Sequence, residues 1–412
     1  MNIIYNMLIY SVWFFATYYV VILLLLMFLG KNKLFESRAF DFKKKPMVSV
    51  LVPAYNEQGK IKHTINSLKK IDYDNIEFII ISDGSKDGTA KEVRANIQGD
   101  KRFTFIDRKE NRGKAATLNQ GIELAKGEFI ATMDADSIAE PRIFYKVLPY
   151  FHDKKVGAVT VSVLVKNPKG FLHKLFYLEF AIGLSLMLKV FSFVNALFVT
   201  PGPFSIYRKS VLDEIGGFDP NCITEDSEIA YRIHKHHYKI DSCMEAKAYT
   251  ILPPTFRKIT IQRKRWYSGA IQTIIKHRNM LFNKKYGAFG YFVAFNYILI
   301  FLGITLFLAS SYLGLHRTLD SVLYFKYTDI NVIERLMDIR FDILAMSRAT
   351  VLGLLSLVFT MFVLVTGLML TRTKCSNRKL SIVAWPLMFF LYQFFWLISV
   401  AALLTGRKIK WR

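Results

Sequence analysis

The chain has 412 residues, of which 52% are hydrophobic and 21% charged, and its mean hydropathy is +0.24. These values exclude an intrinsically disordered protein and are unusual for a soluble one. The formal net charge of +24 indicates an anionic partner, such as nucleic acid, an acidic bilayer surface or a phosphorylated substrate. Three scattered cysteines, Cys222, Cys243 and Cys375, are too few for a disulfide framework or a zinc site.

The first apolar stretch runs from Met7 to Leu29 without a charged side chain, which is long enough to cross a bilayer as a helix. It lacks the basic start and the small-residue cleavage site of a secretory signal peptide, so we expect an uncleaved anchor. Basic residues are concentrated just after it, between Lys31 and Lys45. The positive-inside rule therefore places the C-terminal end of this anchor in the cytoplasm.

Strand and helix patterns alternate in the next segment. Apolar, β-branched runs predict four strands, at 47–52, 76–82, 103–106 and 129–133. Helical spacing of apolar residues predicts intervening helices near 61–68, 86–97 and 115–125. This alternation with short links predicts an α/β domain with a mainly parallel, doubly wound sheet.

Acidic or turn-forming residues follow three of these strands: Asn56-Glu57, Asp83-Gly84 and Asp134-Ala135-Asp136. Ligands of open parallel sheets bind beyond the carboxyl ends of the strands, so these acids should converge on one crevice. Asp134 and Asp136 alternate, so both carboxylates should lie on one side and suit Mg²⁺ or Mn²⁺. The simpler alternative is a pair of solvated loop acids. No G-x-G-x-x-G follows the first strand, so the dinucleotide fingerprint is missing.

The segment from Phe171 to Val199 is apolar but is interrupted by charged residues, among them Glu179 and Lys189. We expect a helix that lies on the membrane face or packs beneath the C-terminal helices, rather than a span.

Thr224-Glu225-Asp226 opens another helical pattern and supplies a candidate general base in Asp226. The structural alternative is a helix start, in which Thr224 caps the helix and the two acids favour its positive end. The histidines between His234 and His237 fit no standard metal spacing, so we expect a basic, solvated helix end.

Further along, Gln262-Arg263-Lys264-Arg265-Trp266 predicts a helix on which Gln262, Arg265 and Trp266 share one face. An amide, a guanidinium fork and a flat ring would suit the hydroxyls, pyrophosphate and sugar ring of a sugar nucleotide. The alternative is a juxtamembrane basic cluster with an interfacial tryptophan.

Three further spans are predicted, at about 288–313, 349–370 and 381–404, with an external loop or surface helix at 320–348. Four spans would leave both termini outside the cell, but the basic tail 406–412 favours the cytoplasm. A fifth crossing would have to come from a re-entrant segment, and this alternative remains open. Residues 30–285 carry 43 basic and 27 acidic side chains, as expected for a domain beside an anionic leaflet. We therefore expect an anchor at 1–30, a cytoplasmic domain with interfacial helices at 31–285 and a membrane cluster at 286–412.

Taken in order, five motifs resemble the processive, inverting glycosyltransferases of the cellulose, chitin and hyaluronan synthase type. They are Pro53-Ala-Tyr-Asn-Glu57, Asp83, Asp134-x-Asp136, Thr224-Glu-Asp226 and Gln262-x-x-Arg265-Trp266. The resemblance implies a GT-A catalytic domain inserted between transmembrane helices, with the C-terminal cluster forming a polymer channel in the cell membrane.

The same resemblance implies a role for each matching residue. Tyr55, Glu57 and Asp83 would hold the uridine, Lys114 and Arg265 would approach the phosphates, Asp134 and Asp136 would bind the metal and Asp226 would be the base. Gly202, Gln262, Arg263 and Trp266 would contact the acceptor chain.

Its implied activity is transfer of N-acetylglucosamine from UDP-N-acetylglucosamine to a growing β-1,6-linked polysaccharide of the biofilm type. A small accessory membrane protein is implied as a partner, and nucleic acid is not. One alternative is a non-processive transferase that loads a single sugar onto a lipid phosphate, which would not need the residues 262–266. A non-enzymatic protein that binds anionic polymer would explain the charge but not the ordered acids.

Overall fold

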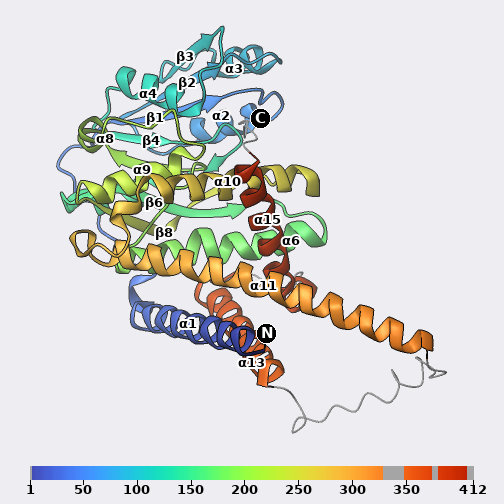
Figure 1. The fold of residues 1–412 in the computed structure, drawn as a ribbon. Helices are drawn as coiled ribbons and strands as arrows, with labels where there is room; N and C mark the ends of the chain where they lie inside the picture. The colour runs from blue at the N-terminus through green and yellow to red at the C-terminus, as the bar shows by residue number, and fades with distance from the viewer. Residues whose placement is uncertain (1, 328–347, 374–378, 406–412) are drawn as a thin grey trace.

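The computed structural model describes residues 2–327, 348–373 and 379–405, and it places an α/β domain beside a group of long apolar helices (Figure 1). The domain is built on one eight-stranded sheet with the order β3-β2-β1-β4-β7-β6-β8-β5. Its strands are β1 Val48–Ala54, β2 Ile76–Asp83, β3 Phe103–Arg108, β4 Phe129–Thr132, β5 Ile138–Ala139, β6 Val156–Val165, β7 Ser205–Arg208 and β8 Lys239–Thr250.

The first half of the sheet confirms the predicted parallel arrangement. β1 pairs with both β2 and β4, and β2 pairs with β3, all in parallel. The connecting helices are α2 Ile61–Lys69, α3 Thr89–Ile97 and α4 Lys114–Leu124. Because the strands run in parallel, the polar residues that follow β1 and β4 meet at one edge of the sheet.

The second half of the sheet is mixed and was not predicted. β7 is antiparallel to both β4 and β6, whereas β6 and β8 are parallel and β5 pairs antiparallel with β8. The helices here are α5 Ile143–Val147, α8 Lys209–Ile215 and α9 Glu225–Lys235. The predicted α/β fold class is confirmed, but the sheet also contains three antiparallel strand pairings outside its parallel half.

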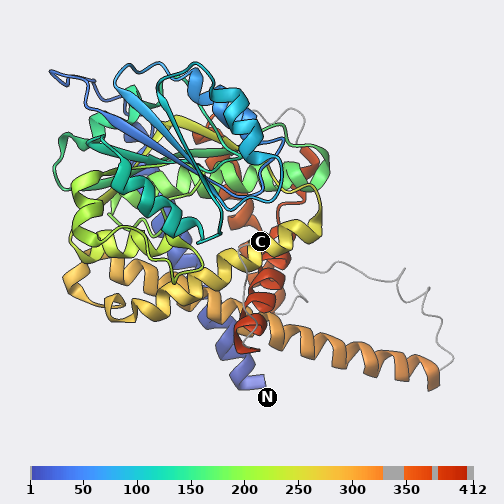
Figure 2. The same cartoon turned by 90° about the horizontal axis from the view of Figure 1, so that it is seen from above.

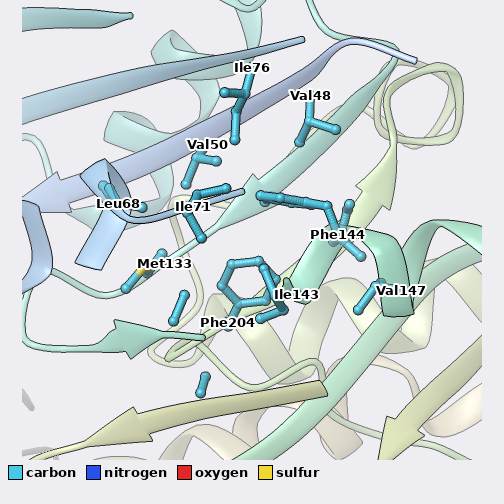
Figure 3. Packing of buried hydrophobic residues seen from close by; sticks show 14 of the residues in the cluster. Val48, Val50, Leu68, Ile71, Ile76, Met133, Ile143, Phe144, Val147 and Phe204 are labelled. Atoms are coloured by element: carbon cyan, nitrogen blue, oxygen red, sulfur yellow. The ribbon is translucent and has the colours of Figure 1, made fainter. Parts of the chain in front are cut away.

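Apolar side chains cover the faces of the sheet. All seven residues of β1 are buried, as its unbroken apolar run requires for a central strand. Figure 3 shows Val48, Val50 and Ile76 from the sheet beside Phe144 and Phe204. Burial of apolar surface is the main favourable term in folding, and here it holds the carboxyl ends of the strands in place.

The apolar segment after β6 forms α6 Gly170–Ala181, a π-helical stretch Ile182–Met187 and α7 Leu188–Phe193. Its length and composition would allow it to cross a membrane, yet 72% of its apolar window is buried within the protein. The segment packs beneath the sheet domain, between that domain and the long helices (Figure 1). The expectation was a helix on the membrane face or beneath the C-terminal helices. The segment contacts α13 and α14 of those helices, and it also contacts β6 and β8 of the sheet.

Within the described part of the chain, five helices are long and apolar enough to span a membrane, including that buried one, where four spans were expected. The other four are α1 Asn2–Leu29, α11 Gly287–Tyr327, α13 Arg348–Leu370 and α15 Leu387–Leu404. Large apolar side chains such as Phe14, Phe301 and Phe362 are exposed on them, which suits contact with lipid.

Two boundaries in this region differ from the expectation. α11 continues as helix to Tyr327, past residue 320, where an external loop or surface helix was expected to begin. Residues 328–347 and the tail 406–412 lie outside the described residues. The span expected at 381–404 is broken, because α14 Lys379–Val383 ends before a turn at Pro386 and α15 begins at Leu387. Proline lacks the backbone N–H that a helix interior needs.

α10, Phe256–Lys276, joins the two parts of the molecule. It runs between the sheet domain and the long helices (Figures 1 and 2), and Tyr267 stacks on Trp396 of α15 with ring centroids 4.5 Å apart. On its other side Gly269 meets Thr224, the residue that precedes α9.

We predict that Gly269→Ala lowers the free energy of unfolding by about 1–3 kcal/mol, the usual cost of overpacking. A β-carbon at this position would lie 2.3 Å from Thr224 Oγ1 and 2.8 Å from its Cβ, so rotation of the threonine cannot relieve the clash. Thermal unfolding in detergent measures the change. Adding Thr224→Gly should restore most of the stability, and Gly314→Ala, in open space on α11, is the matched control. Equal melting temperatures for Gly269→Ala and Gly314→Ala would contradict this packing.

Candidate active site

Eleven of the twelve predicted site residues line one cavity of about 780 Å³. It begins where β1, β4 and α9 present their polar ends and extends between α10 and the apolar helices. The residues that line it are Tyr55, Glu57, Lys114, Asp134, Asp136, Gly202, Asp226, Gln262, Arg263, Arg265 and Trp266. The structure therefore brings together side chains that are up to two hundred residues apart in the sequence.

At the centre of the cavity's polar end, one lysine forms ion pairs with two carboxylates. Lys114 Nζ lies 2.7 Å from Asp134 Oδ1 and 2.6 Å from Glu225 Oε1, and all three groups are on different elements. Burial opposes the charge of this ammonium, but the carboxylates of Asp134, Glu225 and Asp226 outweigh that effect and raise the pKa of Lys114. Lys114 is therefore a fixed positive charge among the acids.

Gly202 lies directly against this ion pair. A β-carbon there would lie 2.8 Å from Lys114 Nζ and 2.9 Å from Asp134 Oδ2. Its carbonyl accepts a hydrogen bond of 3.1 Å from the Asp134 amide. A glycine is thus required for the 201–203 loop to approach the acids, and it keeps the space beside the Asp134 carboxylate open.

Asp136 and Glu57 face the same cavity from neighbouring loops. Lys60 Nζ lies 2.8 Å from Glu57 Oε2 and 3.9 Å from Asp136 Oδ2, so one cation serves both carboxylates. The side chains of Asp134 and Asp136 keep 31% and 22% of their surface exposed, respectively. Two partly exposed carboxylates in one cavity are suitable oxygen ligands for a hard divalent cation.

Asp226 lies in the first turn of α9, and its backbone is fixed by Thr200. Its carbonyl accepts hydrogen bonds from the Thr200 amide at 3.0 Å and from Thr200 Oγ1 at 2.8 Å. Burial raises the pKa of Asp226 to about 6, with Glu225 adding to the rise and Lys114 and Arg265 opposing it. A carboxyl group with this pKa is ionised at neutral pH and can accept a proton.

Among the described residues, Thr224 gives α9 no side-chain cap, and its Oγ1 is buried without a hydrogen-bond partner. The capping alternative is therefore wrong for Thr224. Acids still occupy the first turn, where they favour the positive end of the helix.

α10 confirms the predicted helix around Gln262, Arg265 and Trp266, and all three line the cavity. Gln262 Oε1 is buried and has no hydrogen-bond partner among the described residues. The cavity therefore contains an unused acceptor that a substrate hydroxyl or amide could satisfy.

Arg263 has a strong partner within the protein. Its guanidinium lies 2.7 and 2.6 Å from the two carboxylate oxygens of Glu179 on α6, and it lies 4.6 Å from the centre of the Trp266 ring. Burial opposes its charge, but Glu179 outweighs burial and raises the pKa of Arg263. This geometry makes Arg263 a support for the Trp266 ring and a tie between α6 and α10.

Asp83 is absent from the described residues that line the cavity. Its buried carboxylate accepts hydrogen bonds from the amides of Arg112 and Gly113, at 2.9 and 2.8 Å, and from Arg108. It therefore orients the loop that leads directly into Lys114. The expected role in uridine binding stays a prediction.

A second cluster of potential metal ligands, Asp219, Cys222 and Glu228, lies outside this cavity. The Lys276 ammonium is bonded to both carboxylates, and His277 Nε2 lies 3.0 Å from Glu228 Oε1. Burial opposes the charge of Glu228, but hydrogen bonds from His277, Arg232 and Lys276 lower its pKa to about 2. Protein cations already neutralise this cluster, and we assign it a structural role.

The parallel half of the sheet carries acids beyond its strand ends, beside a cavity that apolar helices line, as expected of a GT-A glycosyltransferase domain with membrane helices. The model for the family "Glycosyltransferase like family 2" matches residues 46–269, and the chain belongs to this family. The solved structure of the mannosyltransferase PcManGT from Pyrobaculum calidifontis, in complex with GDP-Man and Mn²⁺, has the same fold. It aligns with a TM-score of 0.64 and 18% identity over 97% of this chain and 100% of that one.

Among curated proteins, the chain is similar to the poly-beta-1,6-N-acetyl-D-glucosamine synthases of staphylococci. It is 32% identical over 246 residues to the protein of Staphylococcus aureus strain MSSA476, covering 58% of this chain and 60% of that one. The Staphylococcus epidermidis protein is 31% identical over 230 residues, or 56% of each chain. The matched part spans about 60% of the length of these relatives, and the resemblance expected from the motifs is confirmed.

Glu225 is the site residue that sequence reasoning missed. It adjoins Asp226, and both acids were assigned to one helix start, but only Asp226 was given a chemical role. No local pattern pointed to its role, because its ion pair with Lys114 joins residues that are far apart in the chain.

We predict that activity decreases as the pH falls through about 6, because Asp226 must be ionised to accept a proton and is neutral below its pKa. Asp226→Asn should bind the donor nearly as well as the wild type but turn over roughly 10²–10⁴-fold more slowly, and its rate should no longer have this acidic limb. Rates across pH 5–8, with donor binding by calorimetry, measure both. A collapse of donor affinity with retained turnover would make Asp226 a binding residue.

We predict that Arg263→Met and Glu179→Gln each destabilise the protein by about 3–5 kcal/mol, because either leaves a buried charge or polar group unpaired. The double variant should recover part of this loss, since it replaces the ion pair with uncharged groups. Thermal unfolding measures each, and Lys264→Met, on the same turn of α10, is the control. Independent, additive losses in the double variant would contradict the ion pair.

Proposed function

We propose that this chain is a processive, inverting transferase that polymerises N-acetylglucosamine from UDP-N-acetylglucosamine and passes the chain across the membrane. The observation that carries this proposal is the continuity of the cavity. Asp134 and Asp226 lie at its polar end, while Asn296 of α11 and Trp396 of α15 line the same cavity among the apolar helices. A growing chain that leaves the acids would enter the space between these helices.

Donor and linkage are supported by similarity to proteins described as poly-beta-1,6-N-acetyl-D-glucosamine synthases. On this proposal Tyr55 and Glu57 bind the uridine side of the donor, with Asp83 acting at least through the loop before Lys114. Lys114 and Arg265 would face the phosphates, because both line the cavity and both act electrostatically on Asp226. Both cations would stabilise the charge that develops on the leaving diphosphate.

Asp134 and Asp136 suit a divalent cation, Mg²⁺ or Mn²⁺, which would neutralise the diphosphate of the donor when bound. The fit rests on two structural features. Both carboxylates keep exposed surface in the cavity, and Gly202 leaves open the space that a β-carbon would fill at 2.9 Å from Asp134 Oδ2.

Asp226 would accept the proton of the acceptor hydroxyl as the new bond forms, from the fixed first turn of α9. The acceptor sugar would lie beside Gly202, against the Trp266 ring, with Gln262 Oε1 accepting one of its hydrogen bonds. Arg263 would contribute by holding Trp266.

The topology on this proposal has the sheet domain in the cytoplasm. The anchor comprises residues 1–30, the catalytic domain with α6 and α7 at the membrane surface comprises 31–285, and the channel cluster comprises 286–412. The basic surplus of the catalytic domain favours an anionic leaflet. A small accessory membrane protein would bind on the lipid-facing side of this cluster.

We predict that Asp134→Asn and Asp136→Asn each remove most activity at saturating donor without changing membrane insertion, because each removes one charged oxygen ligand. Activity in membranes titrated with Mg²⁺ or Mn²⁺ after chelation is the measurement, and Asp153→Asn, outside the cavity, is the control. If both cavity variants keep the activity and the metal dependence of the wild type, Asp134 and Asp136 do not bind a catalytic metal.

The proposed function is tested with purified membranes, several UDP-sugars and Mg²⁺ or Mn²⁺, followed by linkage-specific hydrolases. We predict that wild type makes long polymer only from UDP-N-acetylglucosamine.

Trp266→Ala should lose polymer synthesis far more than it loses hydrolysis of the donor to free sugar, because the Trp266 ring binds the chain end between additions. A single sugar on lipid phosphate as the main product would contradict the proposal, and an unchanged ratio would reject Trp266 as the acceptor platform.

A further inference from the structure

The membrane part of the cavity contains one buried amide that the proposed reaction does not use. Gln393 lies in the middle of α15, its side chain is 93% buried, and its Oε1 has no hydrogen-bond partner among the described residues. It also lines the cavity described above. An amide at this depth of an apolar helix is costly unless a partner satisfies it, so intramembrane polar residues commonly mark a path for a polar ligand.

The helix opposite leaves room for such a ligand. Gly303 of α11 faces Gln393, and a β-carbon there would lie 3.6 Å from Gln393 Nε2. Two helical turns earlier, Asn296 of α11 supplies a second amide to the same cavity. Two amides on facing helices thus line this part of the cavity, among mostly apolar and aromatic side chains.

Flat aromatic rings complete the lining. Trp385, Phe389 and Trp396 line the cavity from the same side as Gln393, and the Tyr267 ring stacked on Trp396 ties this region to α10. Aromatic rings pack on the C–H faces of sugars, while amides pair with the polar groups at a sugar's edge. The combination suits a carbohydrate better than an ion or a lipid tail.

We propose that Gln393 binds the sugar chain inside the membrane by pairing with an acetamido group. Its Oε1 would accept from the amide N–H of one N-acetylated sugar, and its Nε2 would donate to the acetyl carbonyl of a neighbouring one. A glucosamine chain presents ammonium groups, which donate hydrogen bonds but cannot accept one from Nε2, so this position favours N-acetylated chains. The inference rests on the proposed function, because a chain must enter the cavity before Gln393 can bind it.

The first test compares wild type with Gln393→Met, which keeps an unbranched side chain suited to an apolar helix. Phe394→Leu, at a neighbouring lipid-exposed position, is the matched control. The initial rate of UDP release should stay within about twofold of wild type. The median polymer length at equal turnover should be about fivefold shorter, the factor expected for losing one hydrogen bond in each holding step. Equal length distributions for wild type, Gln393→Met and Phe394→Leu would overturn the inference.

The second test uses soluble oligosaccharides of matched length, N-acetylglucosamine pentamer and glucosamine pentamer, and measures thermal stabilisation of the detergent-purified protein. Wild type should be stabilised more by the N-acetylated pentamer, and Gln393→Met should lose this preference. A preference unchanged in the variant would overturn the inference even if its polymer is shorter. If wild type makes no polymer from UDP-N-acetylglucosamine, the proposed function fails first, and that result is distinct from either outcome here.

Discussion

The Lys114 ammonium between Asp134 and Glu225 is the interaction on which the site depends. Three carboxylates in a buried cavity would repel one another, and this one cation makes their proximity tolerable. Removing one partner of a buried charge pair is strongly destabilising, so the ion pair also fixes the end of β4 relative to the start of α9. Asp83, outside the cavity, helps to position Lys114. Its carboxylate accepts hydrogen bonds from the amides of residues 112 and 113, directly before Lys114 at the start of α4.

Two glycines allow close backbone contacts that connect this ion pair to the helices next to the membrane part. Gly202 allows its loop to reach the acids, and Gly269 allows α10 to reach the start of α9. α10 then joins α6 through Arg263 and Glu179 and joins α15 through Tyr267 and Trp396. The same helix thus contacts both α9, which carries Asp226, and the apolar helix α15.

Sequence patterns predicted the parts of the fold that local periodicity encodes. The strands at the parallel half, the helix carrying Trp266 and the acids after β4 all followed from spacing. The second half of the sheet did not, because β7 has only four residues and its pairing with β4 joins segments far apart in the chain. Tertiary partners were equally hidden: Glu179 looked like an interruption of an apolar helix, yet it pairs with Arg263. His234, expected on a solvated helix end, is buried and lies 2.7 Å from the Leu197 carbonyl, and burial lowers its pKa to about 4.

The central claim is that one cavity couples sugar transfer to passage through the membrane helices. The most direct measurement uses sealed inverted vesicles supplied with radiolabelled UDP-N-acetylglucosamine on the outside, where the sheet domain would be exposed. The account predicts long polymer that resists an added linkage-specific hydrolase until detergent opens the vesicles. Product that is digested without detergent, or that consists of single sugars extracted with lipid, would contradict it.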